Sequence, residues 1–233
     1  NIWRAPADND MYIKKEWKRA RYDGTYTRTY DIKVQRKGSD VTIFAHISVA
    51  ADAVQPVLTG KIVWTVDCEG GITGNISVKR GQEFPMLPRF GMRLFLNKEL
   101  DEIAYYGMGP YESYKDKHRA SLHGLYGGNV LELHEDYIRP QENGSHTDCD
   151  YVVAAGGRHG LAAASSKPFS FNASVYAQEE LEEKAHNYEL EPSGSTVLCL
   201  DYAQSGVGSN SCGPKLMEQY RLDDEEINFC IKL

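Results

Sequence analysis

The sequence predicts an all-β fold, a large antiparallel β-sandwich in which residues 1–233 form a single domain. Several segments alternate apolar and polar residues with a period of two, as strands do when one face is buried. Clusters of Gly, Pro, Ser and Asp separate these segments at spacings typical of antiparallel sandwiches. The chain also contains 15 Tyr and 21 Gly, a composition that favours strands joined by turns. No linker or internal repeat divides it, and all-β folds of this length are often one domain.

The clearest predicted strand covers residues 40–50. Alternate residues from Val41 to Val49 are apolar and share one face of an extended strand, whereas a helix would distribute them around its axis. Six further segments alternate in the same way, and the residues on one face of each are Tyr26, Arg28, Tyr30, Ile32 and Val34; Ile62, Trp64, Val66 and Cys68; Phe90, Met92, Leu94 and Leu96; Phe169, Phe171, Ala173 and Val175; Leu198, Leu200 and Tyr202; and Ile227, Phe229, Ile231 and Leu233.

Turns and two short helices complete the predicted framework. Turn signals rich in glycine lie between predicted strands, at residues 37–40, 69–71, 156–157 and 192–194. Helical patterns are few, and we expect helices only at residues 11–20 and 178–186. The second predicted helix carries a cluster of four glutamates, Glu179, Glu180, Glu182 and Glu183, which is typical of a solvated helix face.

Charge and hydropathy exclude several classes of function. The formal net charge is −7 and no basic stripe interrupts it, so we do not expect a nucleic-acid partner. The longest apolar runs, such as residues 161–164, are too short to cross a bilayer, and no segment has the pattern of a signal peptide. We therefore expect a soluble protein with no membrane partner. Because the chain starts at Asn1 and not at an initiator Met, we expect that an upstream segment was removed.

The cysteine pattern argues against stabilisation by disulfides or zinc. Five cysteines are present, widely spaced and never as a CxxC pair, so neither a disulfide framework nor a zinc site is indicated. Cys68, Cys199 and Cys230 lie in apolar runs and are expected to be small core residues. Cys212 instead lies in a loop of Gly, Ser and Asn.

Two polar loops have compositions that suit a sugar, and a rigid sandwich usually places its function on loops. Residues 106–119 combine several tyrosines with carboxylates such as Glu112, which would suit the apolar face and the hydroxyls of a pyranose. Residues 139–146 place Glu142 and Asn143 side by side, and these supply acceptors and donors for a hydroxyl-rich ligand. From composition alone, a folded loop with solvated charges is the favoured interpretation of residues 106–119, and an ordinary Asn-Gly turn is a strong alternative for residues 139–146.

A third loop, residues 205–214, is rich in glycine but does not fit a nucleotide site. A phosphate cradle needs a helix after the glycines and usually a lysine in register, whereas Pro214 and a strand-like sequence follow here. Elsewhere the histidines lack metal-binding spacing and no Gly-x-Ser-x-Gly elbow is present. No pair of carboxylates stands out as a glycosidase dyad.

Taken together, five motifs resemble, in order, those of the small-chain domain of family-2 β-galactosidases. They are Trp3-Arg4-Ala5-Pro6-Ala7-Asp8-Asn9-Asp10; Leu87-Pro88-Arg89-Phe90-Gly91; Gly107-Met108-Gly109-Pro110 with Glu112 and Tyr114; Pro140-Gln141-Glu142-Asn143-Gly144; and Gly208-Ser209-Asn210-Ser211-Cys212-Gly213-Pro214. The motifs extend over nearly the whole chain, and their common order is a stronger signal than any one of them.

The resemblance implies a C-terminal, non-catalytic module whose fold is the large antiparallel supersandwich of galactose mutarotases. It also implies that the parent enzyme hydrolyses terminal non-reducing β-D-galactose residues with retention, which needs two carboxyl groups about 5 Å apart. In this family both are glutamates on a (β/α)₈ barrel that precedes the module. We therefore expect no catalytic residue in this chain and no activity of the chain alone. The Mg and Na ions of the family lie on other domains, so we expect no metal or cofactor here.

The same resemblance implies that the module walls one side of the galactose pocket and helps to exclude water. The implied substrate-binding residues are Glu112, Glu142, Asn143, Asn210, Ser211 and Cys212. Cys212 matches a position where the best-known bacterial member has a tryptophan that stacks on the sugar, and a thiol cannot provide that platform. The implied partners are the catalytic barrel and a galactoside, in an oligomeric parent enzyme of the bacterial cytoplasm or periplasm.

Two other functions stay open from the sequence. A stand-alone mutarotase-like epimerase would need a histidine acid and a carboxylate base near the anomeric carbon, and His146 with Glu142 is the pair available. A carbohydrate-binding module would need exposed aromatic residues for stacking, and the candidates are Tyr105, Tyr106, Tyr111 and Tyr114.

Overall fold

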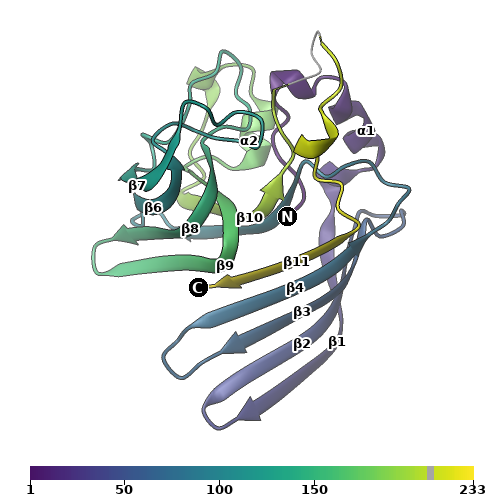
Figure 1. Cartoon of the computed structure of the whole chain (residues 1–233), viewed down its shortest axis with the longest axis vertical. Coiled ribbons are helices and arrows are strands. Elements are labelled where there is room, and N and C mark those ends of the chain that lie inside the picture. The colour runs from purple at the N-terminus through teal and green to yellow at the C-terminus, as the bar shows by residue number, and fades with distance from the viewer. Residues whose placement is uncertain (209–212) are drawn as a thin grey trace.

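The computed structural model describes residues 1–208 and 213–233, and in this part of the chain eleven strands form one antiparallel network (Figure 1). Hydrogen bonds join them in the order β1-β2-β3-β4-β11-β9-β8-β6-β7, while β10 pairs with both β9 and β5. The strands are β1 (Tyr26–Lys37), β2 (Asp40–Ala50), β3 (Leu58–Val66), β4 (Ile72–Arg80), β5 (Arg89–Asn97), β6 (Glu102–Gly109), β7 (Leu122–Asn129), β8 (Ser145–Gly156), β9 (His159–Ser174), β10 (Ser195–Gln204) and β11 (Glu226–Lys232). This large sandwich-like sheet confirms the predicted all-β antiparallel class.

Helices are short and lie at the margins of the network. They are α1 (Ile13–Arg19) and α2 (Gln178–Glu183), with 3₁₀ turns η1 (Asp8–Asp10), η2 (Tyr22–Gly24), η3 (Asn187–Glu189) and η4 (Glu218–Tyr220). The two predicted helices are therefore confirmed, each shorter than expected. Within the described residues, no helix has the length and apolarity needed to span a membrane.

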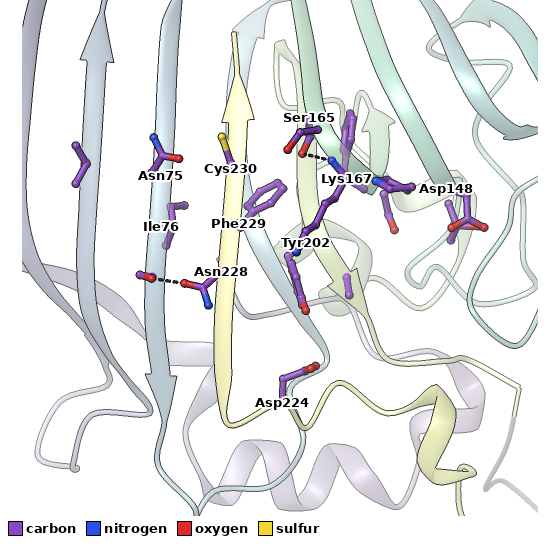
Figure 2. Close-up of a pocket in the computed structure, with 18 of the residues that line it drawn as sticks. Asn75, Ile76, Asp148, Ser165, Lys167, Tyr202, Asp224, Asn228, Phe229 and Cys230 are labelled. Carbon is purple, nitrogen blue, oxygen red and sulfur yellow. Dashed lines mark hydrogen bonds between the residues drawn. The ribbon is translucent and has the colours of Figure 1, made fainter.

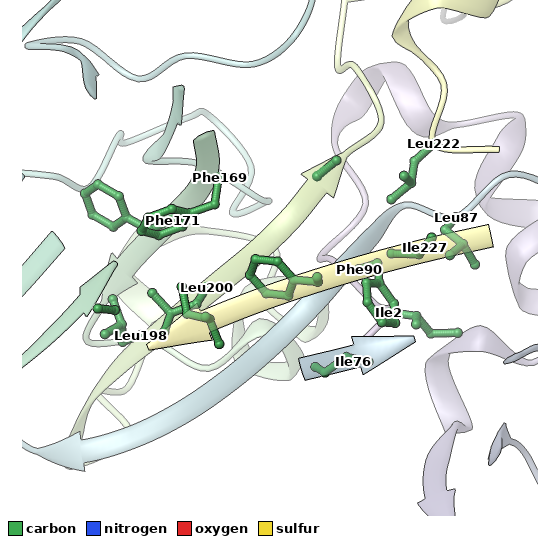
Figure 3. Packing of buried hydrophobic residues seen from close by; sticks show 14 of the residues in the cluster. Ile2, Ile76, Leu87, Phe90, Phe169, Phe171, Leu198, Leu200, Leu222 and Ile227 are labelled. Atoms are coloured by element: carbon green, nitrogen blue, oxygen red, sulfur yellow. The ribbon is translucent and has the colours of Figure 1, made fainter. Parts of the chain in front are cut away.

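Strand β9 connects the two parts of the network. Its residues 159–164 pair with β8, and Ala164 also bridges Lys232 of β11. Its residues 170–174 pair with β10 on the other side. Because one strand takes part in both pairings, side chains from β4, β5, β9, β10 and β11 meet in a common core (Figure 3).

That core contains most of the apolar faces predicted from the sequence. Phe169 and Phe171 of β9, Leu198 and Leu200 of β10, and Ile227, Phe229 and Ile231 of β11 are all buried. Cys199 is also buried, as expected, and burial raises the pKa of its thiol to about 12. Period-two alternation therefore located the interior sides of these strands.

The far end of the β1–β4 sheet departs from the prediction. Ile32 and Val34, on the predicted inner face of β1, are 61% and 63% exposed. Strand β1 is the edge of the network and pairs only with β2, and these strands run beyond the rest of the molecule (Figure 1). Cys68, expected in the core, is exposed in the turn after β3. Alternation shows which residues share a face, but not whether another layer covers that face.

Four strands, β4, β6, β7 and β8, were not among the predicted segments. Strands β6 and β7 contain glycines at Gly107, Gly109, Gly124 and Gly127, which lower strand propensity and conceal the alternation. As a result, the polar region predicted as a loop from residue 106 begins inside β6, and the one predicted up to residue 146 ends inside β8.

Candidate functional site

The candidate site is built around the stem that follows β10, residues 205–208. Ser205 donates its backbone N–H to Pro88 O (3.0 Å), and Gly206 donates to Tyr220 O (2.8 Å). The Ser205 hydroxyl donates to Leu87 O (2.7 Å) and accepts the N–H of Leu222 (2.9 Å). The stem is thus fixed between the start of β5 and the segment that leads to β11.

The N-terminal motif holds the stem from a second side. Arg4 is fully buried and forms a two-point ion pair with Asp10, with N–O distances of 3.1 and 2.8 Å. Its guanidinium also donates to the carbonyls of Ser205 and Gly206. Asn9 donates its side-chain amide to Val207 O (2.8 Å). A planar guanidinium with several donors can satisfy a carboxylate and two carbonyls at once.

Asp116, in the first polar loop, holds the stem from a third side. Its carboxylate oxygens accept the N–H of Val207 (2.9 Å) and the N–H of Gly208 (2.7 Å). With these bonds, every backbone N–H and C=O of residues 205–207 has a partner. The segment is therefore rigidly held although it is neither helix nor strand.

Beneath the stem, Arg89 gathers a group of buried charges. It donates to Glu142 (2.9 Å), to both oxygens of Asp201 (3.2 and 2.5 Å) and to Asn172 Oδ1 (2.9 Å). Burial raises the pKa values of Glu142 and Asp201, and the positive charge of Arg89 opposes this shift in both. One cation thus holds two carboxylates away from water.

Three predicted substrate-binding residues lie in this scaffold and already have protein partners. Glu142 bonds to Arg89. Glu112 is buried and accepts from Gly144 N (2.8 Å), Lys117 and Tyr137. Asn143 accepts the N–H of Glu135 (3.0 Å) through its side chain. Among them, Glu112 lines a cavity of about 420 Å³, together with Asp116, Lys117 and Tyr137.

The other three predicted residues, Asn210, Ser211 and Cys212, lie outside the described residues. They follow directly after the stem in the sequence. The structure therefore brings Glu112, Glu142 and Asn143 into the networks that surround the stem. Sequence reasoning did not single out Arg4, Asn9, Arg89 or Asp201 for any role, although the first three lie within the motifs that it quoted. Their signal was a charged or polar side chain close to Pro or Gly within a motif, which by itself does not reveal a distant partner.

The pair that an epimerase would need does not face an open site. His146 is buried, and its Nδ1 lies 2.9 Å from Tyr105 Oη and 3.1 Å from Met108 O. Burial lowers the pKa of His146 to about 4, so the ring is neutral at pH 7 and is a poor general acid. Glu142 is occupied by Arg89. This geometry disfavours the epimerase hypothesis.

The tyrosines proposed for sugar stacking are only partly accessible. Tyr105 and Tyr114 are 1% and 2% exposed, so the expectation that they form an exposed platform is wrong. Tyr111 is 62% exposed, and Tyr106 is half-buried against the ring of Tyr151. A continuous aromatic surface at this loop is therefore not formed.

Another cavity lies away from the predicted residues, along the edge of β11 (Figure 2). It measures about 880 Å³, within the usual range of ligand pockets. Tyr202 and Phe229 meet edge to face at one side, with ring centroids 6.3 Å apart. Polar groups of Asn75, Asn228 and Lys167 also line it. Within the described part of the chain, no group of three or more His, Cys, Asp or Glu is arranged to hold a metal ion.

Comparisons with known proteins agree with the family that the motifs resemble. A family model described as "Beta galactosidase small chain" matches residues 1–233. The chain is 45% identical over 226 residues to a β-galactosidase of Actinobacillus pleuropneumoniae, covering 97% of this chain and 22% of that protein. It is 41% identical over 233 residues to a β-galactosidase of Staphylococcus xylosus, covering all of this chain and 23% of that protein. A β-galactosidase of Kluyveromyces lactis is 33% identical over 236 residues, which cover 98% of this chain and 22% of that protein. The chain thus spans less than a quarter of the length of each of these relatives.

Proposed function

The chain belongs to the β-galactosidase small-chain family, and from this premise we propose that it is a non-catalytic module of a β-galactosidase that walls one side of the galactose pocket. The observation that carries the pocket role is the stem at residues 205–208, on which the N-terminal motif and the loop of Asp116 converge. A wall that meets a sugar must keep its shape without the sugar, because ordering it on binding would cost affinity. The bonded stem meets that condition.

The buried carboxylates support a non-catalytic role. Retaining hydrolysis needs an acid/base and a nucleophile about 5 Å apart, on either side of an accessible glycosidic bond. Glu142 and Asp201 are instead 5% and 0% exposed and are both paired with Arg89. In this proposal the reacting carboxylates lie in the part of the enzyme that this chain does not span, and so do the Mg and Na ions of the family.

The proposal also defines partners. The relatives are more than four times as long as the segment that this chain matches. In the proposed parent enzyme, the part that this chain does not span supplies the catalytic barrel. The module and the barrel would enclose the galactoside between them. Exclusion of water from such a pocket strengthens its electrostatic interactions. The parent enzyme is proposed to be an oligomer.

Complementation tests this function. The purified chain alone is expected to hydrolyse nitrophenyl β-galactoside at the rate of buffer. A variant of the Actinobacillus pleuropneumoniae β-galactosidase that lacks the matching 226 residues is expected to be inactive, and to recover activity when this chain is fused in their place. Strong turnover by the isolated chain, or full activity of the shortened relative without it, would contradict the proposal.

A second candidate function, saccharide binding by the module itself, is favoured by the cavity in Figure 2. Its aromatic edge at Tyr202 and Phe229 and its amides at Asn75 and Asn228 are groups that sugars use. Calorimetric titration of the isolated chain with lactose and longer galactosides separates the two functions. Binding that is tight and is lost in Asn228→Ala would favour the second, whereas a pocket completed only by the barrel predicts weak binding by the chain alone.

A further inference from the structure

Asp116 lies at the tip of a tight, well-supported turn. Tyr114 and Lys117 exchange both of their backbone hydrogen bonds, at 2.8 and 3.0 Å, and leave Lys115 and Asp116 between them. Lys117 is also paired with the buried Glu112. The turn that presents Asp116 is therefore closed across its base and tied to a buried carboxylate.

The turn is also attached to the start of β8. Ser113 donates its N–H to Ser145 O (2.6 Å), and its hydroxyl accepts the N–H of Thr147 (2.9 Å). Ser113 is completely buried. Hydrogen bonds thus fix Ser113 to β8, and Ser113 is followed directly by Tyr114, which closes the base of the turn that carries Asp116.

Two glycines of the stem leave room for that carboxylate. A Cβ added to Gly206 would lie 2.5 Å from the carboxylate of Asp116, and one added to Gly208 would lie 2.9 Å from its Oδ2. Neither glycine has a positive φ, so backbone conformation does not require glycine at these two positions. A side chain at either position would instead displace the carboxylate of Asp116 from its place against the stem.

We propose, resting on the function proposed above, that Asp116 is a positioning residue of the galactose pocket. Its carboxylate fixes the direction in which the stem leaves the sheet by accepting two consecutive N–H groups, at Val207 and Gly208. A carboxylate can accept both N–H groups, whereas an asparagine offers one acceptor and turns an NH₂ toward the second N–H. Asp116 does not touch reacting atoms in this proposal, and it acts only through the stem.

The experiment compares Asp116→Asn with Asp23→Asn, a change at an exposed aspartate in η2, in the fused enzyme described above. Because the stem contributes binding surface and no reacting group, loss of its anchor should act mainly on substrate binding. We expect the KM for nitrophenyl β-galactoside to rise about tenfold in Asp116→Asn with kcat changed less than threefold, while Asp23→Asn alters neither. An unchanged KM in a well-folded Asp116→Asn enzyme overturns the proposal.

A second variant, which changes the same contact from the stem side, keeps the proposal testable if Asp116→Asn does not fold. Gly208→Ala pushes the stem away from Asp116 by steric contact, and we expect it to raise KM in the same way. Because the two changes break the same contact, the double variant should raise KM by less than the product of the single effects. Multiplicative effects would show that the two residues act separately and would overturn the proposal.

Amide exchange in the isolated chain separates this inference from the proposed function. In Asp116→Asn, the N–H groups of Val207 and Gly208 should exchange at least tenfold faster, while that of Gly206, which bonds to Tyr220 O, is unchanged. If exchange in the isolated chain is faster but the fused enzyme has no activity, the proposed function fails while the role of Asp116 in holding the stem stands. Unchanged exchange in Asp116→Asn would show that Asp116 does not hold the stem.

Discussion

At the scale of single residues, the decisive feature is a buried arginine shared by two carboxylates. Arg89, Glu142 and Asp201 come from β5, the loop before β8, and β10, and none of them is more than 5% exposed. Placing charges in a protein interior is costly, and mutual attraction offsets the cost only while every partner is present. The sequence showed Arg89 within a motif but gave no indication that its partners lie 53 and 112 residues away.

Replacing Arg89 with methionine should therefore leave two uncompensated carboxylates in the core. We expect Arg89→Met to lower the free energy of unfolding by about 3–5 kcal/mol. Arg93→Met is the matched control, because Arg93 pairs with the largely exposed Glu179, and such surface pairs contribute about 0–1 kcal/mol. Urea unfolding at pH 7 measures both. Equal losses of unfolding free energy in the two variants would show that the buried ion pairs of Arg89 stabilise the fold no more than the exposed pair of Arg93.

At the scale of elements, the pairing of β5 with β10 explains the glycine that follows Arg89 in its motif. Gly91 lies opposite Asp201 in this pair. A Cβ added to Gly91 would lie 2.3 Å from both Leu200 O and Asp201 Oδ1. Since both contacts belong to the neighbouring strand, relief would require the two strands to separate. The glycine thus allows the strands to approach closely at the point where the buried charges meet.

We expect Gly91→Ala to lower the free energy of unfolding by about 1–3 kcal/mol, the usual cost of overpacking a well-filled site. Gly24→Ala provides the comparison, because no atom lies within 4 Å of a Cβ added there. That change should stay within about 0.5 kcal/mol of the unmodified chain. Thermal unfolding followed by circular dichroism gives both values. A Gly91→Ala protein as stable as Gly24→Ala would mean that β5 and β10 can separate at little cost.

At the scale of the whole molecule, the sheet is longer than the layer that covers it. Strands β1 to β3 extend past the common core, and the apolar residues near their ends are exposed or half-buried. Strand β1 is also an edge strand with only β2 beside it, a position where charged residues and bulges discourage association. It carries Arg28, Lys33 and Arg36, and its register shifts between Tyr30 and Lys33.

The same substitution at two valines should therefore change the stability by very different amounts. Val34 is 63% exposed and Val78 is 3% exposed. Val34→Thr should change the free energy of unfolding by less than about 0.5 kcal/mol, as most surface changes do. Val78→Thr buries a hydroxyl and should cost about 1–3 kcal/mol. Chemical denaturation of the isolated chain tests the contrast, and a large loss in Val34→Thr would show that β1 is covered in solution.

The sequence by itself determined the class of fold and the interior faces of the central strands. Alternation at Phe169 and Phe171, or at Leu198 and Leu200, is a local property that follows from the two-residue repeat of a strand. The order of the motifs likewise indicated the family, because each motif is contiguous in the chain. Both kinds of information are contained within short segments, so they could be obtained without coordinates.

Only the tertiary structure decided which faces are covered and which residues form the site. Val34 and Leu198 alternate alike in sequence, yet one is exposed and the other is buried, because coverage depends on a second layer. Arg4 contacts the carbonyl of Ser205, 201 residues away, and Asp116 contacts the N–H of Val207 across 91 residues. Such contacts depend on how the strands pair in space, and local sequence patterns do not contain that information.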